Sequence, residues 1–190
     1  KKLLTGYTTA HSWSVQSEKF RTYFAISFDC DLVAEETYIT HDDNRMEKAL
    51  SGTGTGVGIF VGLASKDVTL RFAISYISEE QAIRSLEREC AGKSLEEVRR
   101  EAAEAWEKRL STIEETETEE QKKTFYSCFY HMFLYPHKFY EPDENGDPIH
   151  YDCCNDVVQK GIAYTDNGFW DTYRTVYPML AIVAPDTFAE

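Results

Sequence analysis

The sequence predicts an α+β chain in which strands come first and helices follow. Residues 67–77 alternate apolar and polar side chains with a period of two, which is typical of a half-buried strand. From Ser78 onward the apolar residues recur at helical spacing instead. Sequences of the form S-x-x-E/Q begin at Ser78 and Ser94, and each is a helix-capping box. This order favours the end of an antiparallel β-sandwich followed by helices.

The strand region extends over residues 1–77. Residues 21–28 repeat the period of two more weakly, and Asp42-Asp43-Asn44 is a turn cluster that separates this strand from the next. Residues 57–63 form another short apolar run. The chain opens without Met and as though in mid-strand, so we expect a multidomain fragment of a longer polypeptide.

The next region, residues 78–112, should be a helical linker. Its first helix carries an apolar stripe and ends at Gly92, and its second helix continues to Leu110 with a second stripe. Residues 79–123 contain 14 acidic and 9 basic side chains, a net charge of −5. We interpret these charges as the solvated outer face of helices whose apolar stripes lie beneath.

Residues 113–190 begin with a third helix, capped by Thr118 with Gln121 and ending before Pro136. Its aromatic stripe is interpreted as core. Residues 141–148 then form a loop with a turn at Asn145-Gly146, flanked by two short segments of a possible hairpin, residues 138–140 and 149–151. A last helical pattern surrounds Val176, Met179, Leu180 and Val183.

The composition excludes several classes of partner. Of 190 residues, 33 are acidic and 20 are basic, so the formal net charge is −13. An acidic chain repels phosphate, and no Lys/Arg stripe interleaved with aromatic residues offsets this locally, so we expect no nucleic-acid partner and no membrane binding. No run reaches the roughly 18 apolar residues that a membrane helix requires. Five cysteines without a C-x-x-C pair favour a reduced, intracellular protein.

Four motifs receive structural interpretations. The glycines of residues 51–58 fit neither phosphate-loop pattern, and we predict a loop leading into a strand. The sequence Asp143-x-Asn145-x-Asp147 begins like a calcium loop but has Pro148 where Gly is needed, so we predict no such site and no metal ligands. The five histidines have no zinc spacing. The adjacent Cys153 and Cys154 are either unpaired thiols or a redox element, and we favour unpaired thiols.

The stretch from Asp166 to Pro178 is the richest in candidate site residues. Asn167-Gly168 permits a tight turn, Asp171 is placed to cap a helix, and Pro178 should kink that helix about two turns in. One interpretation is a capped core helix with buried aromatic residues. The other is a sugar subsite, in which an indole packs on the apolar face of a pyranose and a carboxylate accepts hydrogen bonds from its hydroxyls. Composition alone favours the core helix.

A resemblance favours the subsite. The string Gly168-Phe-Trp-Asp-Thr-Tyr-Arg174, with Pro178 four residues on, resembles the W-D-T-[FY]-R motif of glycoside hydrolase family 92, the calcium-dependent exo-acting α-mannosidases. Segments upstream agree in order and spacing, so the resemblance covers most of residues 57–185.

The resemblance implies a β-sandwich, a helical linker and an (α/α)6 toroid whose first helices occur here. It also implies that Trp170 and Asp171 bind a terminal mannose, with Arg174 supporting the carboxylate. The substrate would be a mannose-containing glycan, with α-1,2 linkages favoured, and calcium would be the cofactor. The catalytic carboxylates and the calcium ligands are expected downstream of Glu190.

Two rival functions remain open from the sequence. The first is a non-catalytic carbohydrate-binding module made of a sandwich and helices, in which the Trp-Asp motif is only a helix start. The second is a helical scaffold for a protein partner, which requires an exposed apolar stripe on the helix at residues 94–110.

Overall fold

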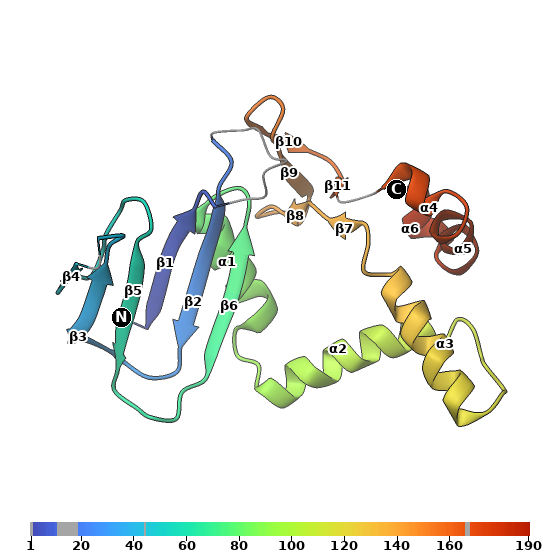
Figure 1. Ribbon diagram of the computed structural model, residues 1–190, viewed down its shortest axis with the longest axis horizontal. Coiled ribbons are helices and arrows are strands. Elements are labelled where there is room, and N and C mark those ends of the chain that lie inside the picture. Colours follow the sequence, from blue (N-terminus) through green and yellow to red (C-terminus); the bar gives the residue numbers. More distant parts are fainter. Residues whose placement is uncertain (1, 11–18, 44, 166–167) are drawn as a thin grey trace. The chain divides into compact units, whose positions relative to one another are not determined.

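The computed structural model describes residues 2–10, 19–43, 45–165 and 168–190. It is a mixed α+β structure, with several small antiparallel sheets and with helices (Figure 1). Two compact units are present, one made of residues 1–15 and 21–91 and the other of residues 16–20 and 92–190. Within the described ranges no helix has the length and apolar character needed to cross a membrane.

The first unit contains a three-stranded antiparallel sheet with one helix against it. Its strand order is β1 (Leu3–Thr8), β2 (Thr22–Phe28), β6 (Leu70–Ser75), and helix α1 (Glu79–Cys90) packs against it (Figure 1). The strands predicted at residues 21–28 and 67–77 are confirmed, the second being shorter than its alternating pattern.

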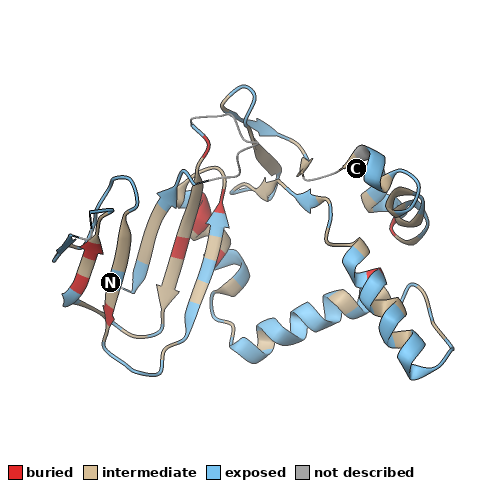
Figure 2. Ribbon diagram, in the orientation of Figure 1, coloured by how far each residue is buried: buried red, intermediate tan, exposed pale blue. Residues whose placement is uncertain are grey.

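Helix α1 packs on the face of the sheet that carries small side chains. Ala25 and Ala82 are completely buried, Leu86 nearly so, and Ala73 lies beside them (Figure 2). The register places Ala25 opposite Ala73, so at this pair two adjacent strands present only a Cβ to the helix, and Tyr23 packs beside the cluster. Small residues let the helix approach the sheet closely enough for dense packing.

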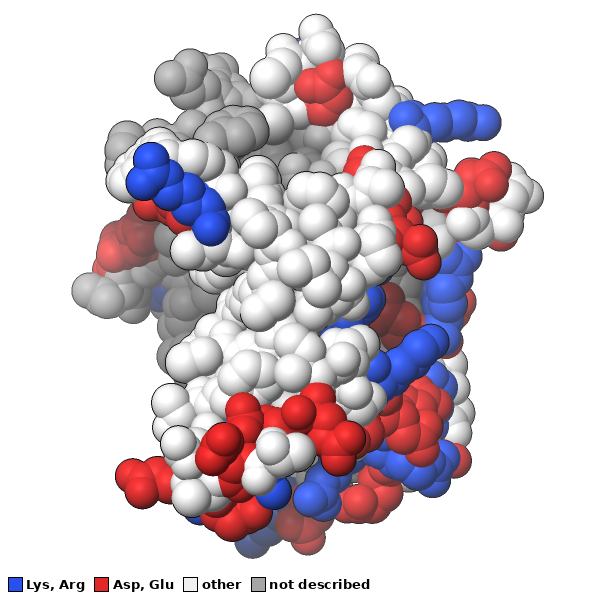
Figure 3. Space-filling view, turned by 90° about the vertical axis from the view of Figure 1, so that its right-hand side faces the viewer, with Lys and Arg blue, Asp and Glu red and all other residues white. Residues whose placement is uncertain are grey.

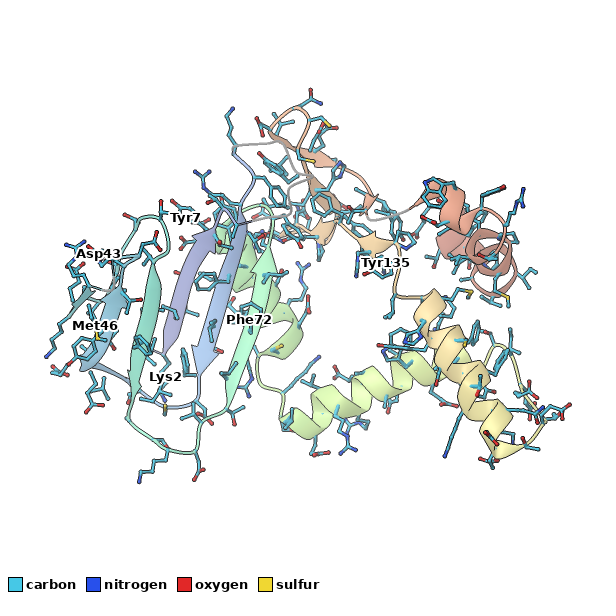
Figure 4. The ribbon with its side chains drawn as sticks, viewed as in Figure 1. Lys2, Tyr7, Asp43, Met46, Phe72 and Tyr135 are labelled. Carbon is cyan, nitrogen blue, oxygen red and sulfur yellow. The ribbon has the colours of Figure 1, made fainter. Side chains whose placement is uncertain are left out.

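The opposite face of this sheet carries most of its large apolar side chains, namely Leu4, Phe24, Ile26, Phe28, Leu70, Phe72 and Ile74. Phe72, labelled in Figure 4, is 54% exposed. The half-buried strand of residues 67–77 is therefore confirmed, and the half that α1 buries is the one with Ala73 and Ser75. Leu70 and Ile74, which lie on the same face as Phe72, are exposed as well.

A second sheet of the first unit has the strand order β4 (Met46–Glu47), β3 (Leu32–Thr40), β5 (Gly58–Leu63). Its register shifts between Val33 and Tyr38, and the buried Thr37 hydroxyl spans the irregularity. That hydroxyl donates to the Val33 carbonyl at 2.8 Å and accepts from the Gly62 amide at 3.3 Å. A buried hydroxyl thus satisfies backbone groups that the ladder leaves unpaired at a bulge.

The glycine-rich segment before β5 is a loop, as predicted. Residues 51–57 contain no strand or helix, and β5 begins at Gly58. A Cβ at Gly52 would lie 2.7 Å from Cγ2 of Ile39, a fully buried residue of β3. Gly52 therefore allows the loop to pack on the sheet. The turn at Asp42 and Asp43 leads to β4, and Asn44 lies outside the described residues.

Three predicted helix starts are confirmed, but one capping box is incomplete. Ser78 accepts from the Gln81 amide at 3.1 Å, as an N-cap should. The box is incomplete because the Ser78 amide donates to the Ser75 hydroxyl at 3.4 Å instead. The Gln81 side chain, which is buried, accepts from Arg84 at 2.6 Å.

The second unit contains α2 (Leu95–Leu110) and α3 (Glu119–Met132), which have complete capping boxes at Ser94 and Thr118. The prediction that an apolar stripe lies beneath the charges of α2 is wrong for this structure. Helix α2 contains no buried residue, and Leu95 is 73% exposed (Figure 2). The reason is that α2 packs mainly at its C-terminal end, where the Trp106 ring lies 4.6 Å from that of Tyr130 on α3.

The charges of this region lie on its surface, as predicted. The residues of α2 pair along the helix, Glu96 with Arg99 and Arg100 with Glu104, each at 3.8 Å. Figure 3 shows acidic side chains interspersed with Lys and Arg at the lower edge of the molecule, at the height of α2 and the start of α3. Such exposed pairs contribute little individually.

Short strands follow α3. The sheet β8 (Glu141–Pro142), β9 (Pro148–Asp152), β10 (Val157–Lys160) contains the predicted turn, with Gly146 at φ 93°. The prediction that residues 138–140 form the first strand of this hairpin is wrong. Strand β7 (His137–Lys138) pairs with β11 (Tyr164–Thr165), and β8 is the strand that pairs with β9. Asp143 closes the turn by accepting from the amides of Asn145 at 2.8 Å and Asp147 at 2.9 Å.

Candidate functional site

The candidate site lies on a single helical turn just after β11. Helix α4 (Phe169–Thr172) is followed by α5 (Val176–Val183) and α6 (Pro185–Ala189). The Gly168 carbonyl accepts from the amides of Asp171 and Thr172, both at 3.1 Å, and from the Thr172 hydroxyl at 2.8 Å. Three donors on one carbonyl hold this turn together without a longer helix.

Trp170 is exposed on this turn. Its exposed fraction is 81%, which is unusual because Trp is highly buried on average. The interpretation of the motif as a core helix with buried aromatic residues therefore does not hold for Trp170. An exposed indole provides a flat apolar surface that remains available to a ligand.

Asp171 lies directly beside Trp170 in the sequence, and its carboxylate folds back over Gly168. A Cβ at position 168 would contact Asp171 Oδ2 and would lie 3.3 Å from its Cγ. Only glycine leaves this space free, so Gly168 determines where the carboxylate can lie. The exposed carboxylate oxygens can accept hydrogen bonds from hydroxyl groups.

Two details of the predicted helix geometry are wrong. Asp171 does not cap a following helix, because it lies inside α4, and the N-cap of α5 is Thr175, which makes no side-chain capping bond. Pro178 falls in the first turn of α5, where a missing N–H costs nothing, and so it starts a helix and does not kink one. Of the turn predicted at Asn167-Gly168, Asn167 lies outside the described residues.

Arg174 lies close to the site but contacts another group. Its guanidinium carbon is 5.1 Å from the centroid of the Tyr173 ring, in cation–π geometry. Among the ion pairs of the described residues, none joins Arg174 to Asp171. The supporting role of Arg174 toward this carboxylate stays a prediction.

A second group of residues near the motif was not predicted. The Tyr164 hydroxyl of β11 donates to Glu190 Oε2 at 2.7 Å, and its ring lies 6.0 Å from that of Tyr140. Burial, together with the bond to Glu190, raises the pKa of Tyr164 well above its usual value, so the phenol remains a donor. This contact joins the two ends of the segment that contains the motif. No local sequence pattern indicates it, because the two residues are 26 positions apart.

A cleft elsewhere in the second unit does not include the motif. It has a volume of about 500 Å³, and α2 contributes Lys108 and Arg109 while the corner between α5 and α6 contributes residues 183–187. Trp170, Asp171 and Arg174 are not among its lining residues. The motif is therefore an exposed surface feature in this chain and not the wall of a closed pocket.

The described residues do not offer a cation site. No group of three or more His, Cys, Asp or Glu side chains within residues 2–10, 19–43, 45–165 and 168–190 could hold a metal ion. Asp143, at the start of the rejected calcium loop, uses its Oδ1 on two backbone amides. The residues present thus do not fit calcium, and no chemical step is assigned to it here.

Comparison with known proteins identifies the family of this chain. The model for the glycosyl hydrolase family 92 catalytic domain matches residues 81–190. The structure is similar to that of the family GH92 inverting mannosidase BT2199 from Bacteroides thetaiotaomicron VPI-5482, with 34% identity and a TM-score of 0.86, covering 95% of this chain and 25% of that one. No curated protein matches.

Two further structures share the fold. One is the family GH92 α-mannosidase BT3965 from Bacteroides thetaiotaomicron, with 23% identity and a TM-score of 0.68, covering 85% of this chain and 23% of that one. The other is the gh92 family glycosyl hydrolase ccman5, with 18% identity and a TM-score of 0.81, covering 98% of this chain and 24% of that one. The chain thus spans about a quarter of the length of these structures.

These matches define the family of the chain. The family model matches residues 81–190, more than half of the 190 residues, and the chain therefore belongs to glycosyl hydrolase family 92. The resemblance read from the Trp-Asp motif is confirmed at the level of the family.

Proposed function

We propose that the chain is part of an inverting α-mannosidase that removes terminal mannose from glycans, with α-1,2-linked mannose as its substrate. The observation that carries the proposal is the exposed Trp170 beside the Asp171 carboxylate. Both lie on a turn held by the Gly168 carbonyl, within the segment matched by the family model.

Each residue of the motif has a role in binding the sugar at its non-reducing end. The Trp170 indole packs against the apolar C–H face of the mannose ring. The Asp171 carboxylate accepts hydrogen bonds from neighbouring sugar hydroxyls, and charge makes these bonds stronger than neutral ones. Arg174 supports the bound arrangement by orienting Asp171. These three residues bind and orient the substrate and do not themselves cleave the bond.

Cleavage with inversion needs two further carboxyl groups. One acts as an acid that protonates the leaving oxygen, and the other acts as a base that activates water, at a separation of roughly 6.5 to 9.5 Å. We assign these groups to parts of the protein outside residues 1–190. The proposal likewise assigns calcium to ligands outside this stretch, on the resemblance alone.

The domain organisation forms part of the proposal. Residues 1–77 would be the C-terminal part of a β-sandwich, residues 78–112 a helical linker, and residues 113–190 the start of an (α/α)6 catalytic domain. The apolar face of the sheet β1–β2–β6 supports the first assignment, because a sandwich packs a second sheet on such a face. The two compact units divide after Ala91, inside the proposed linker. Helix α1 packs against the sheet and therefore belongs to the first unit.

The test is release of mannose from α-1,2-mannobiose by the full-length protein. We expect Asp171→Ala to lower kcat/KM by about 100-fold or more, the size associated with loss of a group that positions the substrate. Asp186→Ala is the matched control, since Asp186 is an exposed aspartate on α6 outside the motif. A calcium chelator should abolish release, and added calcium should restore it.

The results separate this proposal from its rivals. Wild-type activity in Asp171→Ala would refute the subsite assignment. A full-length protein that binds mannobiose without cleaving it would support the non-catalytic binding module. The partner scaffold has one observation in its favour, the exposure of Leu95 and Val98 on α2. Crosslinking of a partner protein to these positions would support it.

A further inference from the structure

The hairpin formed by β9 and β10 carries two adjacent thiols at its tip. Cys153 and Cys154 lie in the turn that follows β9, and both are free and exposed. The other cysteines differ from them in setting, because Cys30 and Cys90 are half-buried in the first unit and Cys128 is alone on α3. The pair is therefore the place in the described chain where two accessible thiols are adjacent in sequence.

The turn that presents the pair is held by one carboxylate. Asp152 Oδ1 accepts from the amides of Cys154 at 2.9 Å and Asn155 at 3.2 Å. Asp152 Oδ2 accepts from the side-chain amides of Asn155 at 2.6 Å and Gln159 at 2.5 Å. The side-chain hydrogen bond from Asn155, followed by the bond from the Cys154 amide, holds the pKa of Asp152 below its usual value. These hydrogen bonds thus hold the backbone around two exposed cysteines.

Metal binding does not account for the pair. Structural zinc needs four protein ligands and catalytic zinc needs three. Over the described parts of the chain no set of three or more His, Cys, Asp or Glu residues is placed to hold an ion. The chemistry that two thiols can complete by themselves is formation of a disulfide with each other.

We propose that Cys153 and Cys154 form a reversible thiol–disulfide couple, whose co-reactant is a low-molecular-weight disulfide. One thiolate attacks the small disulfide, forms a mixed disulfide and releases one thiol. The neighbouring thiolate then attacks the protein sulfur of the mixed disulfide and releases the second thiol. The two cysteines lose two electrons and two protons, one S–S bond forms within the turn, and the small disulfide is reduced to two thiols.

Ring closure between adjacent residues makes this couple easily reversible. Consecutive Cα atoms are about 3.8 Å apart, whereas the Cα atoms of disulfides usually lie about 4.4 to 6.8 Å apart. The ring is therefore strained, and strained, exposed disulfides are the ones that reducing agents open readily. Closure also shifts the Cys154 amide, which donates to Asp152, so the redox state is transmitted to the turn between β9 and β10.

The experiment treats the reduced full-length protein with oxidised glutathione under native conditions, followed by alkylation and peptide mass spectrometry. We expect the peptide that contains residues 149–160 to lose two hydrogen atoms without carrying glutathione, and dithiothreitol to reverse this. In Cys154→Ser the first step can occur but the second cannot, so glutathione should accumulate on Cys153 at least about tenfold above wild type. Cys128→Ser is the matched control and should leave the 149–160 peptide unchanged.

Three outcomes would overturn the proposal. They are stable glutathione on the wild-type pair, a disulfide that joins two copies of the chain, and no reaction of the pair. The experiment is independent of mannose release, so its failure would leave the proposed function untouched.

Discussion

Substitution of Gly168 by alanine tests the site without removing any of its functional groups. The added Cβ would contact Asp171 Oδ2 and lie 3.3 Å from Asp171 Cγ, so the carboxylate must rotate away. Leaving a preferred rotamer costs about 0.5 to 1.5 kcal/mol, so the stability of the protein should change little.

The expected effect is on activity. A displacement of about 1 Å in a group that positions a substrate can lower the rate by about 100-fold, which corresponds to roughly 2.7 kcal/mol of transition-state free energy. We therefore expect Gly168→Ala to reproduce most of the loss in kcat/KM of Asp171→Ala, with Asp171 still present. The assay is release of mannose from α-1,2-mannobiose, combined with thermal unfolding.

Gly146→Ala provides the converse control. Gly146 has a φ of 93°, and a Cβ there would meet nothing within 4 Å. Alanine should therefore cost about 1 to 3 kcal/mol of stability through backbone strain and leave mannose release unchanged. Full activity in Gly168→Ala would refute the argument that glycine determines the position of the Asp171 carboxylate.

Two further predictions concern the framework. Ala25→Leu should lower the free energy of unfolding of the first unit by about 1 to 3 kcal/mol, because Ala25 is fully buried under α1. Phe72→Leu, on the opposite face of the sheet, should lower it by less, because Phe72 is exposed. Equal losses in chemical denaturation would contradict the assignment of the two faces. The cap of α2 should weaken at low pH, because the hydrogen bond from the Ser94 amide lowers the pKa of Glu97. The stabilisation from Glu97 is complete above the pKa of this residue in the unfolded chain and is lost as the pH falls through its pKa in the folded protein. Amide hydrogen exchange in the first turn of α2 should therefore become faster at low pH in the wild type but not in Glu97→Gln.

Local patterns in the sequence predicted many of the elements correctly. The capping residues Ser78, Ser94 and Thr118 mark the observed starts of α1, α2 and α3, because an N-cap depends on only three or four consecutive residues. The alternation before Ser78 identified β2 and β6 for a similar reason. The exposed Trp-Asp pair was also found from the sequence, through its motif.

The errors concern contacts between residues distant in the sequence. The pairing of β7 with β11 and the bond from Tyr164 to Glu190 join segments more than 20 residues apart. Pro178 was assigned to the wrong turn because α4 ends at Thr172 and a separate helix, α5, begins at Val176, a break that the local sequence pattern does not show.

By itself, the sequence determined the order of strands and helices, the helix starts and the family motif, since each of these depends on neighbouring residues and on side-chain periodicity. Only the tertiary structure decided which face of the sheet β1–β2–β6 is covered. A period of two shows that a strand has two faces but does not show which one a helix can approach, and here the small side chains of Ala25 and Ala73 decide it. Likewise, only the structure decided that the Asp171 carboxylate folds over Gly168, because that requires the backbone path as well as the residue types.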